Sequence, residues 1–127
     1  MFWREEDRRA ERNYLSHMLN KRNRLTSKEV AKVFEIGKSF GNGFLRLKMV
    51  PNAVEIPRFA IIASQKIYKK ANKRVAIRRR IYEIVRKVLP DIKIKIDAIV
   101  FVNENKTIDH KELKDSVSKL FIKSGLL

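Results

Sequence analysis

Residues 66–87 read KIYKKANKRVAIRRRIYEIVRK, a stretch with ten basic residues and a single acid, Glu83. Apolar residues return at helical spacing within it, because Ile77, Ile81 and Ile84 lie three or four positions apart. The pattern predicts an amphipathic helix whose apolar side packs on a core while its basic side faces outward.

The concentration of one charge sign on this predicted helix indicates an anionic partner. Like charges four residues apart destabilise a helix, and cations in the first turn oppose the helix dipole. We expect Asn72 to cap the helix, which would place Lys73 and Arg74 in that unfavourable first turn. Phosphate groups would offset both costs, so we expect the basic side to bind nucleic acid. A solvated surface face is the simpler alternative, but such a face normally mixes the two signs.

The composition of the whole chain fits one folded domain. It has 127 residues, 44% of them hydrophobic, and a formal net charge of +16. Cysteine is absent, which excludes a disulfide scaffold, a zinc site with Cys ligands and thiol catalysis. No apolar run is long enough to span a membrane, so we expect a cytoplasmic protein with no membrane contact.

Charge also divides the chain. Residues 1–18 hold four arginines and four acids, so residues 19–127 carry the whole net charge of +16. We therefore expect a charged N-terminal extension at 1–18 and an RNA-binding domain at 19–127.

Apolar periodicity and capping residues predict five further elements. Two helices are marked by capping residues and stop glycines: Thr26, Glu29 and Gly37 for the first, Asp109, Glu112 and Gly125 for the second. Three strands are expected at residues 44–50, 59–63 and 92–102. We expect the first two strands to pair as a hairpin. The order helix, strand, strand, basic helix, strand, helix predicts an α+β sandwich with helices against one small sheet.

The sequence offers no set of residues for catalysis by the protein. Its two histidines, His17 and His110, stand far apart, and no carboxylate pair has a recognisable hydrolase setting. Residues 41–43, Gly-Asn-Gly, read as a turn and not as a phosphate loop, because no Lys-Ser/Thr and no helix follow. We expect no catalytic residue, and no cofactor or metal held by a protein motif.

The aromatic residues leave two interpretations open. Four of them fall on core-facing positions: Phe34, Phe59, Phe101 and Phe121. Tyr68 and Tyr82 flank the basic helix, where they could either stack on a base or cap the core.

Five segments, in this order, resemble the protein subunit of bacterial ribonuclease P. They are residues 18–25 (MLNKRNRL), 33–39 (VFEIGKS), 59–66 (FAIIASQK), 74–83 (RVAIRRRIYE) and 120–127 (LFIKSGLL). The fourth is similar to the family's signature, roughly RNRxKRRxxE. This chain departs from the family at four positions: Gln65 and Ala76 replace basic residues, Val75 replaces Asn, and Tyr82 replaces a common Arg.

The resemblance implies a fold and a function. The fold is of the ribosomal S5 domain 2-like type, α-β-β-β-α-β-α in order, with a left-handed crossover around the basic helix. The implied function is that of an accessory subunit of an endoribonuclease, which removes the 5′ leader of precursor tRNA. In that family the RNA subunit performs the hydrolysis with Mg²⁺, and the protein binds the RNA subunit and the leader. The implied partners are therefore RNase P RNA and precursor tRNA, with one protein monomer in a 1:1 ribonucleoprotein.

Candidate site residues follow from the charge pattern and the resemblance. The candidate RNA-binding residues are Lys66, Lys69, Lys70, Lys73, Arg74, Arg78, Arg79, Arg80, Arg86, Lys87, Arg22 and Arg24. The resemblance also implies a leader-binding cleft between the first helix and the sheet, with Val30, Phe34 and Lys48 as candidates. Two other functions stay open: a structural ribosomal protein of similar fold, and a free-standing basic RNA-binding module.

Overall fold

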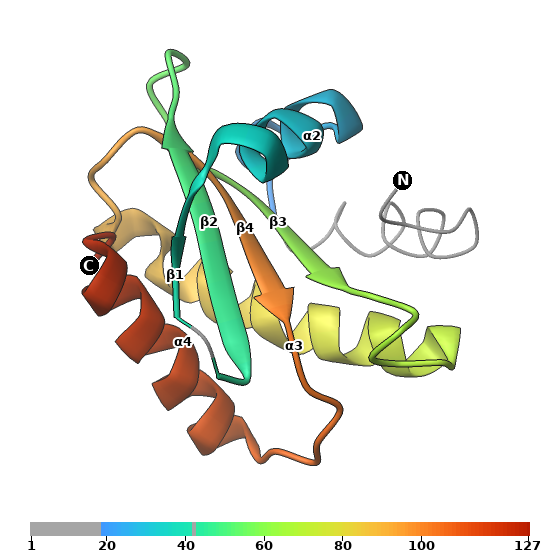
Figure 1. Cartoon of the computed structure of the whole chain (residues 1–127). Coiled ribbons are helices and arrows are strands. Elements are labelled where there is room, and N and C mark those ends of the chain that lie inside the picture. Colours follow the sequence, from blue (N-terminus) through green and yellow to red (C-terminus); the bar gives the residue numbers. More distant parts are fainter. Residues whose placement is uncertain (1–18, 42) are drawn as a thin grey trace.

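The computed structural model describes residues 19–41 and 43–127, so the expected extension at 1–18 lies outside the described residues. A four-stranded sheet in the order β1-β2-β4-β3 forms the centre, with helices on both faces (Figure 1). The strands are β1 Lys38–Phe40, β2 Leu45–Pro51, β3 Arg58–Ala63 and β4 Ile96–Val102. The helices are α2 Ser27–Ile36, α3 Ala71–Val88 and α4 His110–Ser124, with short 3-10 turns η1 Lys21–Asn23 and η2 Leu89–Asp91.

The α+β class and the order α-β-β-β-α-β-α are confirmed from α2 onward. The capping residues act as the sequence predicts. At the start of α2 the amide of Thr26 donates to Glu29 Oε1 at 2.8 Å, and the amide of Glu29 donates to the Thr26 hydroxyl at 3.4 Å. At α4 the Asp109 carboxylate accepts from the amide of Glu112 at 2.8 Å.

The expected hairpin between residues 44–50 and 59–63 is wrong. β2 pairs antiparallel with β4 along its whole length, and β3 pairs with β4 in parallel. The reason lies in β4, which is buried at every position and therefore needs a neighbouring strand on each side. The hairpin partner of β2 is instead β1, a three-residue strand too short to show a period of two.

Two expected boundaries also differ. Helix α3 begins at Ala71 with Lys70 as its N-cap, so Asn72 lies inside the helix and does not cap it. The strand expected from residue 92 begins at Ile96, because Pro90 lies in the 3-10 turn η2 and the chain reaches the sheet only after it.

The core has two parts, one on each face of the sheet. α3 and α4 cover the larger part, in which Phe59 of β3 stacks on Phe121 of α4 with ring centroids 5.8 Å apart. α2 covers the smaller part, in which Val30 and Val33 pack with Ile99 of β4. Burial on both faces accounts for the near-continuous apolar runs of β3 and β4.

The connection from β3 through α3 to β4 joins parallel neighbours. In Figure 1 both strands run downward, β4 lies to the left of β3, and α3 passes behind the sheet. With α3 turned toward the viewer and the strands pointing up, the chain moves to the left. The crossover is therefore left-handed, as the resemblance implies and against the general rule for such connections.

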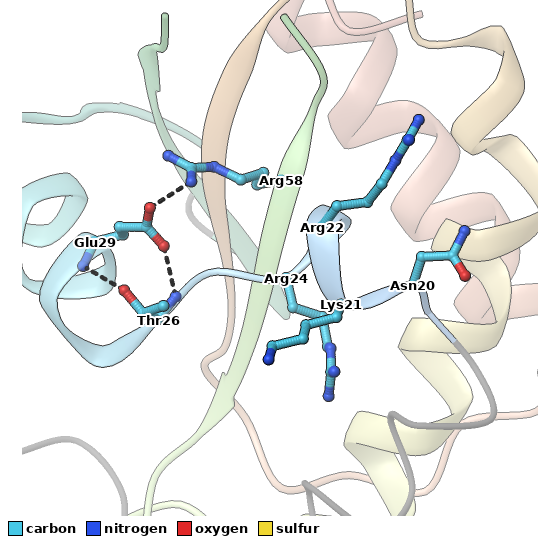
Figure 2. Close-up of a pocket in the computed structure, with 7 residues that line it drawn as sticks. All are labelled: Asn20, Lys21, Arg22, Arg24, Thr26, Glu29 and Arg58. Carbon is cyan, nitrogen blue, oxygen red and sulfur yellow. Dashed lines mark hydrogen bonds and ion pairs between the residues drawn. The ribbon is translucent and has the colours of Figure 1, made fainter. Parts of the chain in front are cut away.

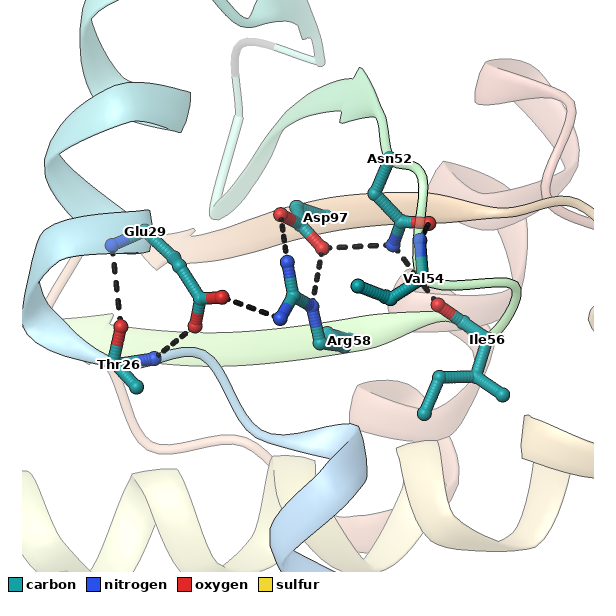
Figure 3. Close-up of polar contacts among 7 residues, drawn as sticks. All are labelled: Thr26, Glu29, Asn52, Val54, Ile56, Arg58 and Asp97. Atoms are coloured by element: carbon teal, nitrogen blue, oxygen red, sulfur yellow. Dashed lines mark hydrogen bonds and ion pairs between the residues drawn. The ribbon is translucent and has the colours of Figure 1, made fainter.

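A polar network ties α2 to the sheet (Figure 3). Arg58 of β3 donates from Nε and Nη2 to the two carboxylate oxygens of Asp97 in β4, both at 2.8 Å, and its Nη1 pairs with Glu29 of α2. Asn52 donates to the same carboxylate at 2.8 Å. The hydrogen bond to Asp97 raises the pKa of the Arg58 guanidinium. Because Asp97 is only 5% exposed, these donors replace the hydrogen bonds that water would otherwise make to its carboxylate.

Replacing this arginine should therefore cost much of the stability of the domain. We expect Arg58→Met to lower the free energy of unfolding by about 3 kcal/mol, because it leaves a buried carboxylate without its cation. Urea titration of both proteins measures the difference. The matched control is Lys95→Met, which removes an exposed pair with Glu55 and should cost less than about 1 kcal/mol. Equal losses in the two variants would contradict this role for Arg58.

Candidate RNA-binding surfaces

Helix α3 has the two sides that its sequence predicts. Its apolar residues Ile77, Ile81, Ile84 and Val85 are buried against the sheet and α4. Seven of the predicted RNA-binding residues in and before the helix are exposed: Lys66, Lys69, Lys70, Lys73, Arg79, Arg86 and Lys87. Arg80 is half-buried, since its Nη2 donates to the carbonyl of Ile108 at 2.8 Å. The four of these on the helix itself, Lys73, Arg79, Arg86 and Lys87, form a cationic outer side of α3, directed away from the sheet.

Two predicted RNA-binding residues, Arg74 and Arg78, are instead buried, each only 1% exposed. Arg74 Nη1 donates to the carbonyls of Tyr68, at 2.6 Å, and Lys69, at 3.2 Å. Arg74 thus ties the first turn of α3 to the segment that leads into it. The sequence placed both arginines among surface cations because a basic run does not reveal which of its members turn inward. In this conformation their guanidinium groups are not offered to a ligand.

Tyr68 and Tyr82 cap the core, which resolves the two interpretations that the sequence left open. Tyr82 is 1% exposed, and its hydroxyl accepts from the amide of Ile61 at 3.1 Å. Tyr68 is 5% exposed, and its hydroxyl donates to the carbonyl of Glu104 at 3.1 Å. Burial raises the pKa of Tyr68. Neither ring lies on the outer side of α3.

The two departures from the family's signature occupy different positions on α3. Val75 is half-buried at the edge of the apolar side, whereas Ala76 is exposed on the outer side. Its neighbours one turn away along the helix are Asn72, Arg79 and Arg80. The outer side of α3 therefore has a small residue within its cationic surface.

The segment before α2 runs along the open edge of β3. The amide of Leu25 donates to the carbonyl of Phe59 at 3.1 Å, and Asn23 donates to the carbonyl of Pro57 at 2.9 Å. A hollow of about 640 Å³ opens beside this segment, lined by Asn20, Lys21, Arg22, Arg24, Thr26, Glu29 and Arg58 (Figure 2). Arg22 is exposed and Arg24 is half-buried, and Figure 2 shows Lys21 and Arg24 extending to the same side. Both predicted arginines thus lie at one hollow.

A second surface lies between α2 and the sheet, where the leader-binding residues were predicted. Phe34 of α2 is 42% exposed, meets the edge of Phe101 at 6.1 Å between ring centroids, and lies under the ammonium of Lys48 at 4.6 Å. Lys48 also donates to the carbonyl of Phe34 at 2.7 Å. Val30 is 5% exposed and belongs to the core beneath.

Arg46 adds a second cation to this surface, with its guanidinium 5.3 Å from the Phe101 ring. The sequence did not single it out, although Arg46 and Lys48 are two apart on β2 and so face the same way. Two rings and two cations thus meet on the α2 face of the sheet. An exposed ring with adjacent cations suits a single-stranded nucleic acid, whose bases can stack on it.

Neither a metal site nor a membrane span is found in the part of the chain that the structure describes. No three His, Asp or Glu side chains of residues 19–41 and 43–127 gather as a metal site would require. None of the helices in those ranges is long and apolar enough to cross a bilayer.

The buried and exposed arginines of α3 should respond differently to substitution. We expect Arg74→Met to lower the free energy of unfolding by about 2 kcal/mol, because the carbonyls of Tyr68 and Lys69 lose a charged donor. Arg86→Met, on the exposed side of the same helix, should change it by less than about 0.5 kcal/mol. Chemical denaturation followed by circular dichroism measures both. An unchanged free energy of unfolding in Arg74→Met would show that the buried guanidinium does not anchor the helix.

Comparison with known proteins identifies the family to which this chain belongs. Residues 19–125 match the family model described as Ribonuclease P. The ribonuclease P protein component of Syntrophomonas wolfei is 38% identical over 84 residues, which cover 65% of this chain and 70% of that protein. The chain belongs to the ribonuclease P protein family, and solved structures of that family share its fold. A Staphylococcus aureus RNase P protein mutant has a TM-score of 0.79 at 20% identity, covering 90% of this chain and 98% of that one.

The RNase P protein from Thermotoga maritima has a TM-score of 0.69 at 22% identity, covering 76% of this chain and 93% of that one. At these identities the likeness concerns the fold, while the family model and the sequence relative carry the assignment. The family model spans nearly all of the described chain. The matched residues include α3, α4 and the segment that precedes α2. This chain is therefore a ribonuclease P protein component by family, and a subunit of that ribonuclease.

Proposed function

We propose that this protein binds the RNA subunit of ribonuclease P and assists removal of the 5′ leader from precursor tRNA. The observation that carries the proposal is the outer side of α3, whose four exposed cations are supported from behind by a buried apolar stripe. Ammonium and guanidinium groups bind phosphates without reading sequence, as a structured RNA partner requires. Membership of the ribonuclease P protein family supports RNase P RNA as that partner.

In this proposal the RNA performs the hydrolysis, with Mg²⁺ bound through RNA phosphates. The protein contributes positive charge and position. Cations on α3 reduce the repulsion between the phosphates of the RNA subunit and those of precursor tRNA, so less Mg²⁺ is needed to hold the two RNAs together. We propose a cytoplasmic 1:1 complex of one protein monomer with one RNA.

The surface on the α2 face is our candidate for the 5′ leader. Phe34 offers an exposed ring over the buried ring of Phe101, and Lys48 and Arg46 lie beside them for phosphates. A leader is single-stranded, so its bases are free to stack where the bases of a duplex are not. Val30 contributes from beneath, by holding α2 on the sheet.

The direct test is reconstitution at low Mg²⁺ concentration. Protein is added to its cognate RNase P RNA, and cleavage of precursor tRNA is followed with and without it. We expect the protein to stimulate cleavage and to lower the Mg²⁺ concentration that cleavage needs. Absence of stimulation would contradict the proposal, and co-sedimentation with a ribosomal subunit would favour a structural ribosomal protein.

The charge of α3 can be tested through the salt dependence of binding. We expect Arg79→Ala to weaken affinity for RNase P RNA and to reduce the slope of log K against log salt by roughly 0.7 to 0.9, one phosphate contact. Filter binding between low and physiological salt measures the slope. Lys119→Ala on α4 removes an exposed charge elsewhere and serves as the control. An unchanged slope for Arg79→Ala would move the interface away from α3.

The α2 surface predicts a leader-specific defect. We expect Phe34→Ala to weaken binding of precursor tRNA to the reconstituted holoenzyme by about tenfold, because one stacking contact contributes about 1 to 3 kcal/mol. Mature tRNA, which has no leader, should bind as before. Ile122→Ala removes an exposed apolar side chain from α4, on the other side of the sheet, as a matched control. Equal weakening for both tRNAs would contradict a leader contact.

A further inference from the structure

We infer that the outer side of α3 binds RNA in double-stranded form, lying along one groove with its cations on the phosphates of both strands. The inference rests on the proposed function and names the form of RNA that the same surface takes. It follows from how the exposed residues are distributed around the helix.

The cations of α3 form two rows. Successive residues turn about 100° around an α-helix axis, so residues seven apart return to nearly the same direction. Arg79 and Arg86 make one such row. Lys73, Arg80 and Lys87 make a second row, about 100° from the first. Within a row the side chains are spaced by roughly 10 Å along the axis, at a rise of 1.5 Å per residue.

A strip without net positive charge separates the two rows. It holds Asn72, Ala76 and Glu83, which lie between the rows in direction around the axis. Glu83 is the only acid of residues 66–87, and it pairs with Lys87 at 3.7 Å. The methyl group of Ala76 adds almost no height to the strip. The outer side of α3 is therefore cationic along its two margins and without net positive charge along its middle.

This cross-section fits a duplex groove better than it fits a single strand. A groove presents two phosphate backbones with a floor between them, and the two rows lie on the order of 10 Å apart on a helix of this diameter. Double-stranded RNA is recognised across its wide, shallow minor groove through phosphates and 2′-hydroxyl groups. Asn72, on the strip, offers an amide that can hydrogen bond to such a hydroxyl.

The outer side of α3 also lacks what other anionic partners need. A single strand needs rings on which to stack, and both tyrosines of this region are buried, Tyr68 at 5% and Tyr82 at 1% exposure. A lipid surface needs large apolar side chains beside the cations, and the strip offers only Ala76. An exposed ring lies instead on the opposite face of the sheet, at Phe34, which packs on the buried ring of Phe101.

The test uses the natural absence of cysteine, which allows one position to be labelled alone. Ala76→Cys carries a tethered iron chelate that releases hydroxyl radicals, and the labelled protein is bound to cognate RNase P RNA. We expect strand cuts in both strands of one helical region, offset across a minor groove. Cuts confined to single-stranded loops, or to one strand, would overturn the inference. Lys119→Cys on α4 is the matched label and should give a different pattern.

Binding competition with unmodified protein gives a second readout that does not depend on the labelled variant. A short RNA duplex should compete with RNase P RNA at least tenfold better than a single strand of the same length. The double variant Arg79→Ala with Arg86→Ala removes both cations of the first row and should reduce the duplex salt slope by about 1.8, or two phosphate contacts. The control pair is Lys119→Ala with Lys123→Ala on α4.

The outcomes separate this inference from the proposed function. Stimulated precursor-tRNA cleavage together with single-strand preference would leave the function standing and reject duplex binding by α3. If the unmodified protein neither stimulates precursor-tRNA cleavage nor binds RNase P RNA, the proposed function itself is rejected.

Discussion

The parallel pairing of β3 with β4 is the constraint on which the rest of the structure depends. Parallel neighbours cannot be joined by a tight turn, so the chain must cross one face of the sheet between them, and α3 is that crossing. Its apolar stripe is held on the core by the sheet, and its first turn is held by Arg74. The remaining side must face outward, and the cations gather there. The position of the basic surface is therefore a consequence of the strand order.

The sheet separates two surfaces of different chemistry. Behind it, the outer side of α3 offers cations with no exposed ring. In front, α2 and β2 bring Phe34 beside Lys48 over Phe101. Arg58 fixes α2 to the sheet through Glu29 and Asp97, so the front surface depends on a partly buried ion network. One small domain can therefore offer a duplex and a single strand to different faces, which is the arrangement our proposals require.

Local signals predicted the local structure, and tertiary competition decided the rest. The stripe of α3 and the caps at Thr26 and Asp109 need only nearby residues, and each is confirmed. The expected hairpin failed because β4, more than thirty residues later, pairs with both strands. A basic run likewise does not show that Arg74 and Arg78 turn inward, each to 1% exposure, because their burial follows from how α3 packs on the rest of the domain. The front surface was only half predicted, because Arg46 and Phe101 meet through strand pairing.

Lysine reactivity in the assembled ribonucleoprotein tests the central claim most directly. Free protein and its complex with RNase P RNA are treated with an amine-acylating reagent, and each modified lysine is identified by mass spectrometry. If the outer side of α3 meets the RNA, Lys73 and Lys87 lose reactivity in the complex, while Lys119 and Lys123 of α4 keep theirs. Protection of the α4 lysines with full reactivity of those on α3 would contradict the account.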